Sequence, residues 1–461
     1  MKNLKRRLEA FSFYDHTGIE KHLEDMASKG WMLTGINKLT WNYERIEPKK
    51  IHFAVTYYPK ASEFDPEPLE GQRIYWDYSE RTGWKHICTS AQMQIFYSEV
   101  DDPVPMETDP VIEVDMIHKA AKRVYLKSYY LLLVIAVLQA ALFVSRLLGD
   151  PIGLLSSSTQ LATGFLWGLL LILCTVEVAG YHLWHRKAVR AADNGEFLET
   201  HGHGLLQKLV LVAAVAALVY IVINLISAGN KVQVTLYLLL LACTFGIVVI
   251  VANVKELLKK KKASRNVNFT ITLAVDIILA VVMAAGFTYG IFHAVSAGGL
   301  DNAFNTEGLL HQIEPPLVIE DLQDVSFGGY VKANRQDESI FLGQRSLNQW
   351  PRFENGKYVQ VPEMKYTVTV VKVSAVYDLC KNSILNKRKD KVQDDGTVFI
   401  DHYEDIDAAP WLAEEAYQLH WSEGILYKYL LCYEDRLIEI EFDWEPTEEQ
   451  MRIVAEKLTG Y

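Results

Sequence analysis

The chain has 461 residues, of which 50% are hydrophobic and 22% are charged, and its formal net charge is −11. Five apolar stretches lie between residues 129 and 292, each close to the ~20 residues that a helix needs to cross a bilayer. This uneven composition excludes a simple soluble, fibrous or disordered protein, and the length suits about three domains at about 150 residues each.

Residues 1–117 predict a small cytoplasmic α+β domain. Its basic first residues are not followed by an apolar segment, so we expect no signal peptide. A capping box, Thr-Gly-Ile-Glu at residues 17–20, predicts a helix over residues 18–29 that Gly30 ends. Alternating residues predict strands at 31–36, 40–46, 51–58, 84–88 and 93–97, with a second helix around 70–80. We expect helices on one face of a mainly antiparallel sheet.

A family resemblance is visible in two places. It lies in residues 11–33, FSFYDHTGIEKHLEDMASKGWML, and in the later pair Gly83-Trp84. They resemble the domain of unknown function 2812, which is found in membrane proteins of Gram-positive bacteria. The turn Met26-Ala27-x-x-Gly30-Trp31 is the most specific part, and the resemblance covers about the first quarter of the chain. It implies a cytoplasmic module followed by membrane spans, often encoded beside PadR-like transcriptional regulators. It implies no known activity and no catalytic residues.

Two tryptophans of this domain, Trp31 and Trp84, each follow a glycine that ends a predicted helix. We expect both to pack the helix ends onto the sheet, with a partner-binding surface as the alternative.

Residues 118–295 predict a transmembrane region with five helices, at about 129–148, 161–181, 209–226, 232–254 and 269–292. Basic residues are unevenly divided between the two sides of these spans. Two, Arg146 and Lys231, lie in the short connections on one side. Fourteen flank the spans on the other side: Lys119, Lys122, Arg123, Lys127, Arg186, Lys187, Arg190, Lys208, Lys255, Lys259, Lys260, Lys261, Lys262 and Arg265. Because Lys and Arg are retained inside, we expect a cytoplasmic N-terminus and an extracellular C-terminus in the cell membrane.

The overall charge is divided in the same way. Residues 301–461 carry 30 acidic and 16 basic side chains, a net charge of −14, so residues 1–300 carry +3. A basic inner side near anionic lipid and an acidic outer domain fit this asymmetry. The acidic part is unsuited to nucleic acid, so we expect no nucleic-acid partner.

Residues 296–316 are expected to be a linker, and residues 317–461 an extracellular α+β domain. Within it the pattern predicts a strand at 365–373, a helix at 374–385 and a hairpin of strands 425–433 and 436–442. A second capping box, at residues 447–450, predicts a final helix with Met451, Val454, Ala455 and Leu458 on one face.

Three features of the outer domain suggest sites. Cys380 and Cys432 are its two cysteines and predict either a disulfide or two buried thiols. Tyr427, Tyr429 and Tyr433 share one strand face, which is either core or the lining of a ligand cleft. An acidic cluster predicts either a solvated loop or a weak cation site without EF-hand spacing. Its members are Asp394, Asp395, Asp401, Glu404, Asp405 and Asp407.

The predicted spans contain two carboxylates, which are costly in a bilayer unless they are paired or protonated. Glu177 lies near the cytoplasmic end of the second span, and we expect it to extend toward the interface. Asp276 lies further inside the fifth span. It suggests either a structural pairing, with a basic residue near the cytoplasmic face or with Asn224 or Asn253, or a transport or proton-relay role.

Four histidines, His182, His185, His201 and His203, fall in the second cytoplasmic connection. They make a zinc site conceivable, because the first two share a helix face and the others form His-Gly-His. No cysteine pair accompanies them.

The sequence contains no P-loop, His-Glu-x-x-His, Gly-x-Ser-x-Gly or dinucleotide-binding motif, and we expect no cofactor. The leading hypothesis is therefore a non-enzymatic membrane sensor or regulator whose outer domain binds an unidentified ligand or a protein partner. The alternatives are a transport component that uses Asp276, and a scaffold or accessory subunit of a membrane complex.

Overall fold

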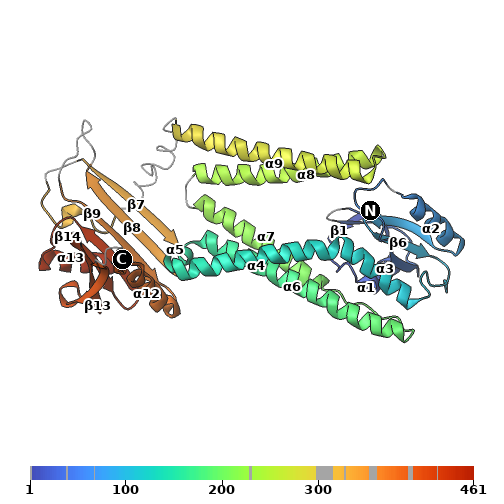
Figure 1. Cartoon of the computed structure of the whole chain (residues 1–461), viewed down its shortest axis with the longest axis horizontal. Helices are drawn as coiled ribbons and strands as arrows, with labels where there is room; N and C mark the ends of the chain where they lie inside the picture. The colour runs from blue at the N-terminus through green and yellow to red at the C-terminus, as the bar shows by residue number, and fades with distance from the viewer. Residues whose placement is uncertain are drawn as a thin grey trace. The chain divides into compact units, whose positions relative to one another are not determined.

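The computed structural model (Figure 1) describes residues 3–37, 40–66, 68–227, 231–296, 315–325, 329–351, 361–392, 398–422 and 424–460. The chain divides into two compact units. The first consists of Met1–Gln139, Leu166–Leu218 and Thr235–Gly290, and the second of Ala140–Phe165, Val219–Val234 and Ile291–Tyr461. Most of the predicted linker, residues 297–314, lies outside the described residues.

Five helices in the described part of the chain are long and apolar enough to cross a membrane. They are α4 (Tyr125–Gly149), α6 (Ser158–Asp193), α7 (Gly204–Ser227), α8 (Lys231–Lys260) and α9 (Arg265–Ser296). The prediction of five apolar helices between two mixed α and β regions is confirmed. The helices extend past the apolar segments because backbone hydrogen bonding continues into polar sequence, as in α6, which runs on to Asp193.

The N-terminal region consists of two three-stranded antiparallel sheets and three helices. One sheet has the order β1-β3-β2, from Leu4–Arg7, Trp41–Arg45 and Trp31–Ile36. The other has the order β4-β6-β5, from His52–Tyr57, Met93–Ser98 and Lys85–Ser90. The helices are α1 (His16–Ser28), α2 (Glu70–Arg81) and α3 (Pro110–Arg123). The sequence pattern did not predict β1 or α3, and the expected domain end at residue 117 falls inside α3.

The start of α1 differs from the prediction. The prediction of a capping box at residues 17–20 is wrong, because α1 begins at His16 and has Asp15 at its N-cap. Thr17 Oγ1 instead lies 2.7 Å from Thr200 Oγ1, and Glu20 Oε1 accepts a hydrogen bond from the Val55 backbone N–H at 2.8 Å. The predicted glycine stop is confirmed, since Gly30 has a φ of +79° that favours glycine.

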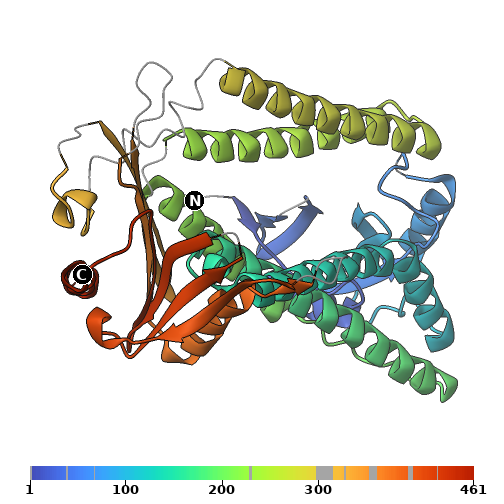
Figure 2. The same cartoon turned by 60° about the vertical axis from the view of Figure 1, so that its left-hand side comes forward.

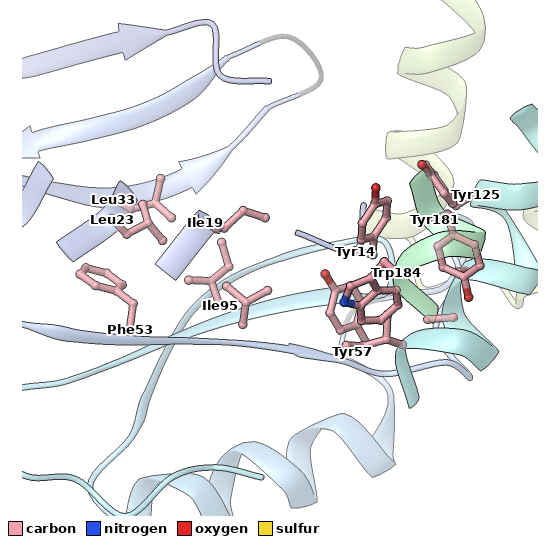
Figure 3. Close-up of a cluster of buried hydrophobic side chains, with 14 of the residues drawn as sticks. Tyr14, Ile19, Leu23, Leu33, Phe53, Tyr57, Ile95, Tyr125, Tyr181 and Trp184 are labelled. Carbon is pink, nitrogen blue, oxygen red and sulfur yellow. The ribbon is translucent and has the colours of Figure 1, made fainter. Parts of the chain in front are cut away.

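The core of the N-terminal region continues into the membrane helices (Figure 3). Ile19 and Leu23 of α1 pack with side chains of both sheets, including Leu33 and Ile95. The same cluster contains Tyr14 and Tyr57 of the domain and Tyr125, Tyr181 and Trp184 of α4 and α6. The Tyr14 and Trp184 rings stack with their centroids 5.2 Å apart. The domain and the first two spans therefore share one core.

The C-terminal region is built on a seven-stranded antiparallel sheet of order β12-β13-β14-β15-β9-β8-β7. Its strands are β7 (Tyr330–Glu338), β8 (Leu342–Pro351), β9 (Met364–Val371), β12 (Asp401–Ile406), β13 (Glu415–Trp421), β14 (Gly424–Cys432) and β15 (Arg436–Phe442). The predicted hairpin corresponds to β14 and β15, and the predicted first strand to β9. The other four strands were not predicted, because their sequences are more polar.

Two helices cover opposite faces of this sheet. One face packs against α13 (Glu448–Thr459), where Val454 and Leu458 join Ile438 and Ile440, and Figure 2 shows α13 on one side of the strands. The capping box that opens α13 is confirmed. The other face packs against α12 (Tyr377–Lys387), which with the turn at Ser374–Val376 forms the predicted helix.

A short helix between the first two spans packs on the same face as α12. This helix, α5 (Pro151–Leu155), buries Ile152 and Leu155 in a cluster with Leu342 and Leu437 of the sheet. Ser158 Oγ donates a hydrogen bond to the Glu338 carbonyl at 2.7 Å, and Ser339 Oγ donates one to the Leu155 carbonyl. The connection that appeared in the sequence as a short loop is thus part of the C-terminal domain.

Candidate functional site

A cavity of about 450 Å³ lies in the second unit, between one sheet face and the helices beside it. This volume falls within the range of about 300–1,000 Å³ that is usual for small-molecule sites. Its wall is formed by the end of α4, α5, the start of α6, and α12. The polar and charged residues that line it are Arg146, Asp150, Ser156, Ser157, Gln160, Arg335, Asp337, Gln344, Ser346, Thr367, Ser383, Lys387 and Glu439.

The floor of the cavity is a polar row across four neighbouring strands. Glu439 of β15 pairs with Thr367 of β9, Thr367 with Ser346 of β8, and Ser346 with Arg335 of β7. Because side chains alternate along a strand, these residues share the sheet face of Leu437. The row lies beside the apolar cluster that holds α5 and α12, so it interrupts an otherwise apolar face.

The charges that line the cavity balance, with three basic and three acidic residues. Arg335 and Asp337 form an ion pair at 2.7 Å. Arg146 donates from Nη1 to Oε1 of Gln160 at 3.2 Å, which connects α4 to α6. Asp150 accepts a hydrogen bond from the Gly153 N–H at 3.2 Å at the start of α5. Hydrogen-bonding side chains therefore line the cavity from α4, from the start of α5, from α6 and from α12.

A second set of polar contacts lies in the first unit, around Glu177 of α6. This carboxylate is fully buried and accepts hydrogen bonds from Ser12 Oγ at 3.1 Å, Tyr125 OH at 2.7 Å and Gln207 Nε2 at 2.7 Å. The expectation that Glu177 extends to the interface is wrong, because the segment before α1 covers it and supplies one of its donors. Glu177 thus joins the N-terminal domain to α4, α6 and α7.

The connection between α6 and α7 binds the N-terminal domain through its backbone. The Thr200 N–H donates to Thr17 Oγ1 at 2.7 Å, and the His203 N–H donates to Ser12 Oγ at 3.0 Å. A Cβ at Gly202 would lie 2.3 Å from an Asp15 carboxylate oxygen, so this close approach requires glycine.

The connection between α8 and α9 binds another part of the same domain. Arg265 of α9 holds both carboxylate oxygens of Asp65, with Nε 2.7 Å from Oδ1. Asn268 Nδ2 donates to the Phe64 carbonyl at 3.0 Å and, at 3.4 Å, to the Lys255 carbonyl of α8. Helices α8 and α9 lie side by side in both views (Figure 1, Figure 2). Both connections therefore lie on the same side of the spans as the N-terminal domain.

Three titratable groups lie inside this domain, next to those contacts. His16 Nε2 lies 3.2 Å from Glu113 Oε1. Burial opposes protonation of the imidazole, but the hydrogen bond and the charge of Glu113 raise the pKa of His16 above its usual value. Burial raises the pKa of Glu20 to about 7. A proton on Glu20 is therefore exchanged near neutral pH.

The four candidate zinc ligands are not brought together. His182 Nε2 lies 2.5 Å from Tyr130 OH, and His185 stacks on His118 with centroids 4.0 Å apart. His201 is exposed, and His203 binds the domain through its backbone N–H. Within the part of the chain that the structure describes, no three His, Cys, Asp or Glu side chains form a group that could hold a metal ion.

The two candidate tryptophans occupy different environments. Trp84 is buried and donates from Nε1 to the Val104 carbonyl at 2.8 Å. Trp31 is half-buried at the start of β2, with Lys5 Nζ 4.9 Å and the Arg45 guanidinium 5.1 Å from its ring centroid. Trp31 is therefore the more accessible of the two.

The candidate residues of the C-terminal domain lie in its core. Tyr429 is buried, and Tyr427 and Tyr433 are half-buried in the same cluster. Cys380 and Cys432 are free thiols in the α12 cluster, where burial raises their pKa values to about 11 and about 12. The disulfide stays a prediction.

The remaining acidic candidates have different environments. Asp276 of α9 is exposed along its helix. Asp401 is buried beside Arg388, 3.3 Å away, and Glu404 lies 3.3 Å from His420. Asp394 and Asp395 lie outside the described residues.

The cavity was not predicted from the sequence. Its one visible signal is Glu439, a carboxylate that follows the apolar pair Leu437-Ile438 in the strand Arg436–Phe442, where Arg436 and Glu441 are also charged. Identifying the rest of the floor would have required the register between strands that lie far apart in the chain.

Comparison with protein families finds a match in the N-terminal part of the chain. Residues 15–134 match the family described as Protein of unknown function (DUF2812), a segment that begins at the N-cap of α1 and ends within α4. No curated protein matches the chain. Residues 15–134 therefore form a domain of the DUF2812 family, as residues 11–33 predicted.

Proposed function

We propose that this protein is an integral membrane sensor or regulator that couples a ligand-binding outer domain to a small cytoplasmic domain. One observation carries the proposal: the same two helices take part in both sites. Helix α4 contributes Tyr125 to the Glu177 contacts and Arg146 to the cavity lining. Helix α6 contributes Glu177 itself and, toward its start, Gln160. A ligand in the cavity would contact helices whose other ends hold the N-terminal domain.

We further propose that the N-terminal domain is cytoplasmic and the C-terminal domain extracellular. The basic connections between α6 and α7 and between α8 and α9 support this orientation, because both bind the N-terminal domain and Lys and Arg are retained inside. The family resemblance suggests a Gram-positive cell. A protein partner of the cytoplasmic domain would receive the signal.

Labelling of intact cells tests the orientation. Single cysteines are introduced at Glu449 of α13 and at Asp25 of α1, both exposed, in a chain without its native cysteines. A membrane-impermeant maleimide should label Glu449→Cys before lysis and Asp25→Cys only after lysis. Labelling of both positions only after lysis would contradict the orientation.

A cavity-filling variant tests the coupling. Ser346→Trp should change hydrogen exchange in the peptides around residues 10–20 and 196–207, because a larger side chain on the floor displaces the α4 and α6 wall. Gln336→Trp is the matched control, since Gln336 lies on the neighbouring strand and does not line the cavity. Changes confined to the C-terminal domain would reject coupling through α4 and α6.

A further inference from the structure

Four charges that line the cavity lack ion-pair partners among the described residues. Arg146 and Lys387 have no carboxylate within ion-pair distance, and Asp150 and Glu439 have no cation. Glu439 is half-buried and the other three are exposed, so a ligand in the cavity that supplies charges of opposite sign would pair with groups that have no such partner in the protein. Because two cations and two anions are involved, a ligand that carries both signs matches the lining better than a simple anion or cation.

The cavity lies directly beside the last turn of the candidate membrane span α4. Gly149 and Asp150 line it, and they directly follow Leu148 in the last turn of α4. Leu142, Val144 and Leu148 are exposed on this part of α4, as expected for side chains that face lipid. In a bilayer crossed by the apolar residues of α4, the cavity would lie at the level of the phospholipid headgroups.

The lining also favours particular ligand groups. Glu439, Thr367 and Ser346 form a row of oxygen acceptors on the floor, which suits an ammonium with several N–H donors. Arg146 and Lys387 on the walls suit a phosphate, to which a guanidinium can donate two parallel hydrogen bonds. A quaternary ammonium has no N–H to offer this floor.

From these observations we infer that the cavity binds an ammonium–phosphate zwitterion at the outer membrane surface. The ligand is either the headgroup of a phospholipid with a primary amine or a soluble compound with the same two groups. This inference deepens the proposed sensor function and rests on it for its purpose. Binding itself is measured without any signalling response, so the two ideas can fail separately.

Native mass spectrometry of the full-length protein tests the lipid source. The protein is released from micelles containing equal amounts of phosphatidylethanolamine, phosphatidylcholine and phosphatidylglycerol, and the retained lipids are counted. Titration calorimetry with glycerophosphoethanolamine tests the soluble source. We expect preferential retention of phosphatidylethanolamine, and about tenfold or greater weakening of binding in Glu439→Gln. Binding of only the soluble probe would identify the soluble source.

Matched variants separate ligand recognition from folding. Glu441→Gln removes a carboxylate two residues along the same strand, where Glu441 pairs with Lys365 and Lys428 outside the cavity lining, and should bind as the wild type does. Lys387→Gln should weaken binding while Lys389→Gln should not, and both are exposed positions suited to replacement. Any of three results would overturn the inference. They are equal retention of phosphatidylcholine, wild-type binding by both Glu439→Gln and Lys387→Gln, and no binding of either probe. Normal binding without the exchange response would instead reject only the sensor function.

Discussion

At the scale of single residues, Glu177 shows how a buried carboxylate is kept in a membrane helix. Its three hydrogen-bond donors come from three segments: Ser12 before α1, Tyr125 at the start of α4 and Gln207 in α7. Hydrogen bonds to a charged acceptor are stronger than those between neutral groups. Glu177 therefore holds these segments together rather than facing lipid.

Removing that carboxylate should weaken the first unit. Glu177→Ala leaves three donors without their acceptor, of which Ser12 and Tyr125 are buried and Gln207 is half-buried. We expect a loss of about 2–4 kcal/mol in the free energy of unfolding. Thermal unfolding of the purified protein in detergent measures the effect. Glu196→Ala, at an exposed position just after α6, is the control and should unfold like the wild type. Equal midpoints for the two variants would refute the structural role of Glu177.

Glu20 should make stability depend on pH. Its pKa is about 7 in the folded protein, above the ordinary value of 4.5, so the folded state holds this proton more tightly. Below about pH 4.5 both states are protonated and the effect is absent. As the pH rises to about 7 the unfolded state loses its proton first, and stability falls by an amount on the order of 3 kcal/mol.

Glu20→Gln should remove this loss. Its unfolding midpoint should fall less between pH 5 and pH 8 than that of the wild type, roughly the range the shift spans. Glu24→Gln removes a similar charge one helical turn away and should keep the wild-type pH dependence. Parallel pH profiles for wild type and Glu20→Gln would show that Glu20 does not carry the dependence.

At the scale of elements, α5 illustrates how a short connection becomes part of a distant domain. It has only five residues, too few for a stable isolated helix, so its conformation depends on the surface it covers. Ile152 and Leu155 supply that contact, together with the hydrogen bond from Ser339 to the Leu155 carbonyl.

Removing part of the apolar contact of α5 should lower the stability of the C-terminal domain. Leu155→Ala removes a buried side chain from the cluster with Leu342 and Leu437, and large-to-small replacements of this kind cost about 2–5 kcal/mol. Limited proteolysis should then cut the domain faster. Ile340→Ala, at a residue 70% exposed, should leave the cleavage rate unchanged. Equal cleavage of both variants would mean that α5 contributes little.

At the scale of the whole molecule, the first unit is held together by contacts on one side of its spans. The N-terminal domain binds the connection between α6 and α7 through Thr17 and Ser12, and the start of α9 through Asp65. These contacts join segments about 200 residues apart, as the separation of 200 between Asp65 and Arg265 illustrates.

Breaking the pair of Asp65 and Arg265 should release the α8–α9 connection from the domain. Asp65 is buried and Arg265 is one-third exposed, so we expect Arg265→Ala to lower stability by about 2 kcal/mol. Hydrogen exchange should rise in residues 60–66 and around 262–268. The reversed pair, Asp65→Arg with Arg265→Asp, should recover part of the loss. A reversed pair no more stable than either single variant would indicate that the geometry, and not the charge pairing, holds the contact.

The sequence by itself determined the five apolar helices and the domain of the DUF2812 family at the N-terminus. It also determined α13 and the hairpin of β14 and β15. Each of these is a local property, because hydropathy, helical periodicity and capping operate within about 20 residues.

Only the tertiary structure decided how Thr17, Glu177 and the cavity lining are used. Thr17 occupies the position of a helix cap in the sequence pattern, but in the structure its hydroxyl contacts Thr200. Glu177 is buried because Ser12 and Gln207 reach it from other segments. The cavity floor depends on the register that aligns Glu439 with Thr367, Ser346 and Arg335, which lie 72 to 104 positions earlier in the chain. Such pairings are set by the packing of the complete domain, because no local pattern distinguishes one strand register from the next when the residues that face each other are polar.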